Sequence, residues 1–173
     1  MRSRTSDWYE TKIRYEKTME DGMQKKVSEQ YVVDALSFTE AENKIIEEMS
    51  SYISGEFTIT DIKHASYNEI FFSENVNDDR WYKAKLQFIT IDEKTEKEKR
   101  TAVYYLVQAS SFPGAVKHIE EVMGTTQIDY VISNLAETMI MDVYEHVTTK
   151  KPAERNDVPE YEQAEQQKEG EQV

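Results

Sequence analysis

The sequence predicts an α+β fold made of two copies of a β-β-α-β unit, with about six strands and two helices related by a pseudo-twofold axis. Three features indicate this fold: a segment that occurs twice, alternation of apolar and polar residues in each copy, and a capped apolar helix pattern after the second strand of each copy. The 173 residues suffice for one full domain or for two small halves that share a core.

The repeat is strongest between residues 31–49 and 105–123, where nine of 19 positions are identical at an offset of 74. Chance would give about one identity. An upstream match at an offset of 73 aligns WYETKIRY (8–15) with WYKAKLQF (81–88). We therefore interpret the chain as an internal duplication. The expected boundaries are a flexible N-terminus at 1–6, repeats at 7–74 and 75–147, and a disordered acidic tail at 148–173.

The first two strands of each copy are indicated by alternation. Tyr9, Ile13 and Tyr15 alternate with polar residues, which is typical of a half-buried strand. The Asp21-Gly22 pair then favours a turn, because this dipeptide accepts positive φ angles. The buried positions expected in the remaining strands are Tyr31, Val33 and Ala35 in copy one, and Tyr82, Ala84, Leu86, Phe88, Tyr105, Val107 and Ala109 in copy two.

A helix is predicted after each second strand. Ser37 and Glu40 form a capping box, which satisfies amide donors at the start of a helix. Ser111 takes the same position in copy two, and Gly124 ends the second helix. The expected buried stripes are Phe38, Ala41, Ile45 and Met49 in the first helix and Phe112, Ala115, Ile119 and Met123 in the second.

A third strand is predicted in each copy, roughly over 57–72 and 127–145. The segment LAETMIMDVYEH could be helical on propensity alone, but its alignment with the β-rich IKHASYNEIFF favours a strand. A right-handed crossover would make the second and third strands parallel, with the first strand antiparallel beside them. The sequence leaves open whether the copies form one six-stranded sheet or two sheets packed face to face.

Composition restricts the function. The formal net charge of −13 argues against direct nucleic-acid binding, which needs a concentrated basic face. No window of 18 apolar residues predicts a membrane helix, and the N-terminus lacks the apolar segment of a secretory signal. With no cysteine, the natural expectation is a cytoplasmic protein without disulfides or thiolate sites.

Catalytic motifs are missing from the sequence. The histidines have no metal-ligand spacing, and His118 is expected on a solvated helix face because it aligns with Lys44. No glycine-rich phosphate loop or nucleophile elbow is present. We therefore predict no catalytic residue, no metal and no cofactor, and we place an enzyme with an unfamiliar site behind the non-enzymatic alternatives.

The doubled WY-x-x-K motif is the one candidate site. Alternation places both tryptophans on the sheet face turned away from the helices, beside cationic side chains, where they could hold a planar or anionic small ligand. The alternative, which we favour, is that the tryptophans pack against the other copy or another subunit. The candidate binding residues are Trp8, Lys12, Arg14, Trp81, Lys85 and Tyr104.

The phrases VVDALSFTEAENKI and WYETKIRYEK resemble a family of small domains of unknown function found in Bacteroidetes gut bacteria and in their phages and mobile elements. The resemblance spans roughly residues 7–147. It implies a cytoplasmic accessory protein, phage-encoded in some cases, and supplies no functional residues. Our leading hypothesis is a non-enzymatic binding or assembly protein that forms a homo-oligomer or binds a host protein. The alternative is an acidic nucleic-acid mimic that inhibits a basic host enzyme.

Overall fold

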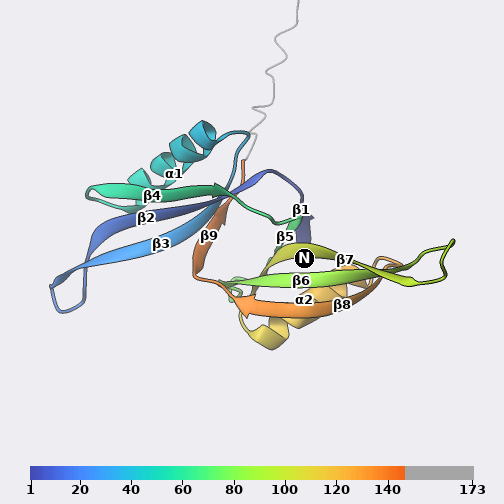
Figure 1. Ribbon diagram of the computed structural model, residues 1–173. Coiled ribbons are helices and arrows are strands. Elements are labelled where there is room, and N and C mark those ends of the chain that lie inside the picture. Colours follow the sequence, from blue (N-terminus) through green and yellow to red (C-terminus); the bar gives the residue numbers. More distant parts are fainter. Residues whose placement is uncertain (147–173) are drawn as a thin grey trace, which may run out of the picture.

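The computed structural model describes residues 1–146 as two β-sheets and two helices, which confirms the α+β class (Figure 1). The helices are α1 (Phe38–Tyr52) and α2 (Phe112–Met123). The strands are β1 (Arg2–Arg4), β2 (Trp8–Thr18), β3 (Gln24–Asp34), β4 (Phe57–His64), β5 (Glu69–Phe72), β6 (Arg80–Ile91), β7 (Glu98–Ala109), β8 (Asp129–Glu137) and β9 (Ile140–Tyr144). The predicted tail at 148–173 lies outside the described residues. Within residues 1–146, no helix has the length and apolarity needed to cross a membrane.

Each half is organised around a long antiparallel hairpin, β2–β3 in the first half and β6–β7 in the second. The first sheet has the strand order β4-β2-β3-β9, and the second has the order β1-β5-β7-β6-β8. In Figure 1 the two hairpins project in opposite directions from a shared middle, with α1 covering one sheet and α2 covering the other. The chain therefore forms two sheets, which answers the question that the sequence left open.

The third strand of each copy was predicted as continuous, and this is wrong. The segment 57–72 divides into β4 and β5, and the segment 127–145 divides into β8 and β9. β4 and β8 lie beside the first strand of their hairpin and run antiparallel to it, so they do not pair with the second strand. The backbone N–H groups of Ala65 and Thr138 donate to the carbonyl oxygens of Trp8 and Trp81, at 2.7 and 2.9 Å, where the outer strands end.

After each break, the chain crosses to the other half. β5 pairs in parallel with β7 of the second half, and β9 pairs in parallel with β3 of the first half. The predicted parallel partner of each second strand is therefore present, but it comes from the opposite copy. Because each sheet contains a strand from the other half, neither half completes its own sheet.

The predicted serine caps and most of the buried stripes are confirmed, although the Glu40 carboxylate accepts from the Leu36 N–H at 3.2 Å and not from the Ser37 N–H of a capping box. The Ser37 hydroxyl accepts from the Glu40 N–H at 3.1 Å, and the Ser111 hydroxyl accepts from the Gly114 N–H at 3.2 Å. Phe38 and Phe112, however, are 55% and 51% exposed. They stand in the first turn of each helix, where the Phe38 ring lies edge-on to Tyr9 with centroids 5.1 Å apart and the Phe112 ring lies edge-on to Tyr82 with centroids 6.4 Å apart. The confirmed stripe residues are Ala41, Ile45, Met49, Ala115, Ile119 and Met123.

Three apolar clusters hold the fold together. One lies between α1 and the first sheet, and another lies between α2 and the second sheet. The third joins the halves and includes Trp8, Trp81, Phe72 and Leu106. This joining cluster places the sheet faces that turn away from the helices against each other in the middle of the molecule.

The two halves also share small irregularities. A bulge at Thr60 in β4 has its counterpart at Ser133 in β8, and each hydroxyl donates to a carbonyl of the neighbouring strand, that of Lys12 at 3.3 Å and that of Lys85 at 3.1 Å. Equivalent positions can therefore be compared one by one between the halves. The common origin of the two halves stays a prediction.

Candidate functional site

Trp8 and Trp81 lie on the sheet face predicted for them, but they are buried, with 0% and 2% of their surface exposed. The Phe72 ring packs between them, with ring centroids 6.3 Å from Trp8 and 5.7 Å from Trp81. The tryptophans thus join the two halves and present no exposed indole. Trp8 Nε1 has no hydrogen-bond partner among the described residues.

The other candidate residues extend outward from this joining cluster. Lys12, Lys85 and Tyr104 are half-buried, and Arg14 is exposed. None of the ion pairs within residues 1–146 involves Lys12, Arg14 or Lys85. Arg14 borders an open groove of about 820 Å³ along the first hairpin. The structure brings the tryptophans together and leaves the cations apart on two hairpins, so the ligand-binding role of this set stays a prediction.

A group of charged side chains lies beside Tyr67, at the border of the joining cluster. Glu10 accepts a hydrogen bond from the Tyr67 hydroxyl and lies 3.3 Å from the Lys63 ammonium. The Lys83 ammonium lies 5.5 Å from the Tyr67 ring centroid and 6.0 Å from that of Tyr104. Burial, followed by the hydrogen bond to Glu10, raises the pKa of Tyr67. Each group has an internal partner, so this cluster stabilises the contact between the sheets.

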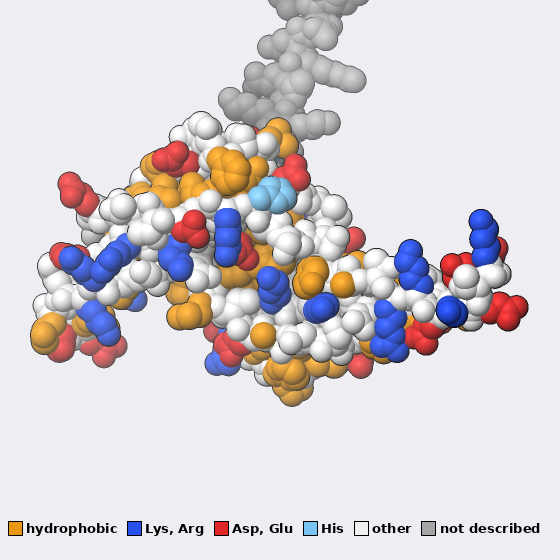
Figure 2. Space-filling view, in the orientation of Figure 1, with side chains coloured by type: hydrophobic (Ala, Val, Ile, Leu, Met, Phe, Trp, Pro, Cys, Tyr) orange, Lys and Arg blue, Asp and Glu red, His pale blue; other side chains and the backbone are white. Residues whose placement is uncertain are grey.

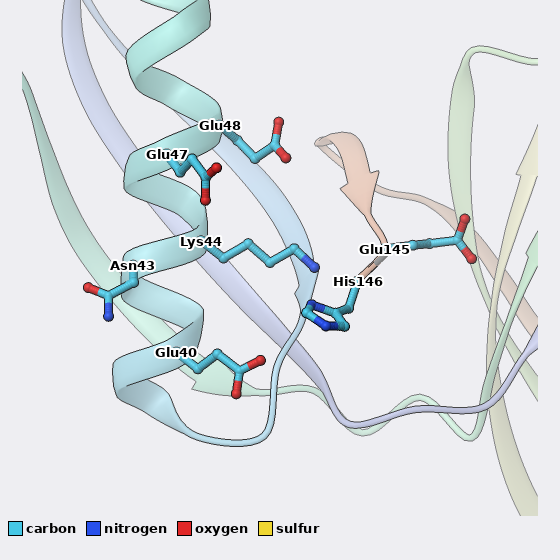
Figure 3. Close-up of a pocket in the computed structure, with 7 residues that line it drawn as sticks. All are labelled: Glu40, Asn43, Lys44, Glu47, Glu48, Glu145 and His146. Carbon is cyan, nitrogen blue, oxygen red and sulfur yellow. The ribbon is translucent and has the colours of Figure 1, made fainter. Parts of the chain in front are cut away.

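A pocket of about 390 Å³ lies between α1 and the last described residues (Figure 3). Figure 3 shows Lys44 pointing from α1 toward His146, while Glu145 points away from the helix. The Lys44 ammonium donates to the Asp34 carbonyl at 3.2 Å, and burial lowers its pKa. The Arg2 Nη1 and Nη2 groups donate to the two carboxylate oxygens of Glu145 at 2.6 and 2.7 Å, and this hydrogen bonding lowers the pKa of Glu145. These contacts tie the N-terminal strand to the end of β9.

A buried carboxylate that sequence reasoning missed lies under α1. Glu29 accepts hydrogen bonds from Tyr15 and Tyr31, the latter at 2.7 Å. Burial, together with Glu29, raises the pKa of both tyrosines. The corresponding residues in the second half are Phe88, Val103 and Tyr105. A signal was present in the sequence, since Glu29 shares the inward face with Tyr31 and Val33.

His118 does not lie on a solvated face as predicted. Its Nδ1 atom is 2.9 Å from the Gln108 carbonyl, and its Nε2 atom is 3.7 Å from the Asp78 carboxylate. Asp78 also accepts from the Ser73 hydroxyl. In a hydrolytic triad the histidine stands between the other two groups, whereas here the aspartate does, so this arrangement does not activate the serine. The described residues contain no group of His, Asp and Glu side chains placed to hold a metal ion.

The edge strands β4 and β8, which hold equivalent places in the two sheets, differ in the charge of their side chains. β4 and β8 are outermost strands, and each pairs only on one side within residues 1–146. Their inward residues are similar, with Ile59 matching Ile132 and Ile62 matching Leu135. The outward residues Asp61 and Lys63 of β4 are replaced in β8 by Asn134 and Ala136.

As a result, residues 130–136 carry no charged side chain, although they form an outer strand. Natural sheets commonly protect such edges with charged residues or proline, because the unpaired backbone groups can bind another chain. β4 has this protection and β8 does not. Figure 2 shows Lys, Arg, Asp and Glu side chains on both hairpins and at both hairpin tips. The edge of β8 is therefore our candidate functional site.

A family model described as a domain of unknown function, DUF4494, matches residues 7–146. No curated protein and no solved structure matches the chain.

Proposed function

Since the chain belongs to the DUF4494 family, whose function is unknown, we propose from its geometry that it is a non-enzymatic protein that binds a partner protein along the free edge of β8. The observation that supports this is the uncharged outer strand of the second sheet, compared with the charged outer strand of the first. The main-chain N–H and C=O groups on such an edge can bind an extended segment, which adds a strand to the sheet.

The proposal also includes the cellular location and the genetic context of the protein. We place the protein in the cytoplasm of Bacteroidetes gut bacteria, as an accessory protein of a phage or mobile element, because of its sequence resemblance and its lack of cysteine. The non-enzymatic role is supported by the polar clusters around Glu10, Glu29 and Asp78, whose hydrogen-bonding groups face one another.

The test uses residues that the first half already contains. The double variant Asn134→Asp, Ala136→Lys transfers the charges of β4 to β8 without changing the inward residues. We expect native mass spectrometry of protein from its natural host to show a specific complex that this variant no longer forms. The matched control is Asp61→Asn, Lys63→Ala, which removes the charges from β4 and leaves β8 intact.

The complex should persist in this control. A wild-type protein that runs as a bare monomer would contradict the proposal, and so would a complex that both double variants retain.

A further inference from the structure

We propose that the β8 edge takes an extended segment that is uncharged and alternately apolar in its middle and carries lysine or arginine at both ends. This inference rests on the proposed function and specifies the partner. Three features of the edge determine this chemistry: its length, the charges at its ends, and the partly buried residues along it.

The length comes from β8 itself. The strand runs from Asp129 to Glu137, which spans roughly 27 Å at the rise of an antiparallel strand. Both ends of this span are acidic, and the seven positions between them, 130–136, are uncharged. The edge thus presents a neutral middle between two carboxylates.

The charges at the ends favour a basic partner. Asp129 is exposed, and the Glu137 side chain is 51% exposed, with Arg80 at 3.8 Å as its nearest cation. Glu120 on α2 adds a third negative charge near Tyr130. Opposite charges that face each other across two strands stabilise their pairing, and like charges weaken it.

The charge near the middle of the edge has the opposite sign. Lys85 lies directly across from Asn134 on the neighbouring strand β6 and has no ion-pair partner within residues 1–146. Lys83 lies across from Ala136, but its ammonium contacts the Tyr67 and Tyr104 rings. A cation in the middle of the partner would approach Lys85, so the basic residues belong at its ends.

The inward residues call for apolar side chains at alternate positions. Tyr130, Ile132 and Leu135 are only half-buried, although they pack against the cluster under α2. A neighbouring strand with apolar residues on the same face would cover their exposed sides, and the hydrophobic gain is about 25 cal/mol for each Å² of apolar surface removed from water.

A second copy of the chain fits this edge less well. If two β8 strands paired antiparallel about their midpoint, Ser133, Asp129 of each copy would lie level with Glu137 of the other, on opposite faces of the sheet because of the bulge at Ser133. Four carboxylates would then gather at the two ends of the pair, with no cation supplied by the second β8 strand. Charge complementarity therefore favours a different protein with a basic-ended segment.

The test uses synthetic peptides of the same length as β8, built from alternating valine and threonine. Selected amides are N-methylated along one edge, so that the peptides do not pair with themselves. One peptide carries lysine at both ends, a second carries the same two lysines in its middle, and a third carries glutamate at both ends. The first two peptides have equal net charge, so they separate the pattern of charge from general attraction to an acidic protein.

We expect the lysine-ended peptide to bind the full chain with a Kd at least roughly tenfold lower than either of the other peptides. Amide hydrogen exchange should slow in β8 and stay unchanged in β4. The variant Asp129→Asn, Glu137→Gln should bind the lysine-ended and glutamate-ended peptides with similar Kd values, because it keeps the edge and removes its terminal charges. It should still bind the peptide with central lysines more weakly, because Lys85 is unchanged.

Two results would overturn the inference. Equal binding of the lysine-ended and glutamate-ended peptides to the wild-type chain would show that the ends do not select the partner. A wild-type dimer cross-linked through β8 would show that a second copy is the occupant. Both results leave edge binding itself in place. The proposed function fails separately, if the wild-type chain runs as a bare monomer or if its native complex persists in both the β8 and the β4 double variants.

Discussion

Strands β4 and β8 hold the same place in the two halves, yet only one of them is protected. In β4, Lys63 pairs with Glu10 at 3.3 Å, and Asp61 lies across from Lys12. In β8, the same positions hold Ala136 and Asn134. Charged side chains on an edge strand hinder the approach of another chain. On our proposal, the β4 edge stays unbound and the β8 edge binds a partner.

The cores under the two helices also differ in polarity. The first half buries the Glu29 carboxylate between two tyrosine hydroxyls, whereas the second half has apolar Val103 and Phe88 in the places of Glu29 and Tyr15. A buried polar group must be hydrogen-bonded to be tolerated, so the first core is more sensitive to small changes. The half with the polar core thus has the edge protected by charges, and the half with the apolar core has the edge without charges in its middle.

The largest effect is expected where the halves are alike. Trp8→Ala and Trp81→Ala should each lower the free energy of unfolding by about 3–5 kcal/mol, because each removes a large buried ring from the joining cluster. Urea unfolding measures both, with Trp→Phe variants as conservative controls. If one tryptophan could be truncated at little cost, the two halves would not contribute equally to this cluster.

A smaller effect is expected at the polar core. Glu29→Val should cost roughly 2–4 kcal/mol, because it leaves the Tyr15 and Tyr31 hydroxyls without their acceptor. Adding Tyr15→Phe recreates the Phe88 and Val103 pair of the second half and should recover about 1 kcal/mol or more. The free energies of unfolding of the wild type, the two single variants and the double variant, measured at equilibrium, form a double-mutant cycle. No recovery in the double variant would mean that the carboxylate contributes through something other than these hydroxyls.

The ion pairs of Glu145 with Arg2 and Arg4, at 2.6 and 3.3 Å, should together contribute at most about 1 kcal/mol, because the Arg2 side chain is 53% exposed. The pKa of Glu145 is lowered from its ordinary value of 4.5 in the folded protein. Its stabilising contribution is therefore complete above pH 4.5 and is lost as the pH falls through the lower folded-state pKa.

The measurement is denaturant unfolding of the wild type and Glu145→Gln at neutral and acid pH. The difference between them should shrink toward zero as the pH falls below 4.5. Glu137→Gln is the matched control. The Glu137 carboxylate is half-exposed, and its distance of 3.8 Å from the Arg80 guanidinium is longer than the contacts of Glu145. A difference that grows in acid would contradict the assigned sign.

The smallest change in the free energy of unfolding is expected at the two bulges. Thr60→Ala and Ser133→Ala each remove one exposed hydrogen bond to a strand carbonyl, so each should cost about 0.5 kcal/mol. Thermal unfolding should show two similar shifts in Tm. Unequal shifts would mean that the same local geometry has different weight in the two halves.

The strands and helices could be predicted from the sequence, because the residue patterns that cause them lie within each segment. Alternation of Tyr9, Ile13 and Tyr15 predicts a strand with one buried face, and Ser37 followed by Glu40 predicts where a helix begins. The repeated pattern also predicts that the two halves have the same element order. The two tryptophans were placed on the correct face, since side-chain direction alternates strictly along a strand.

What only the tertiary structure decided depends on residues distant in the chain. The breaks after β4 and β8 send β5 and β9 into the opposite sheet, and alternation within one segment carries no information about the sheet it joins. That exchange buries the indoles of Trp8 and Trp81 between the halves. It also leaves β8 as an outer strand, so the uncharged run 130–136 became a candidate site only when its place in the sheet was known.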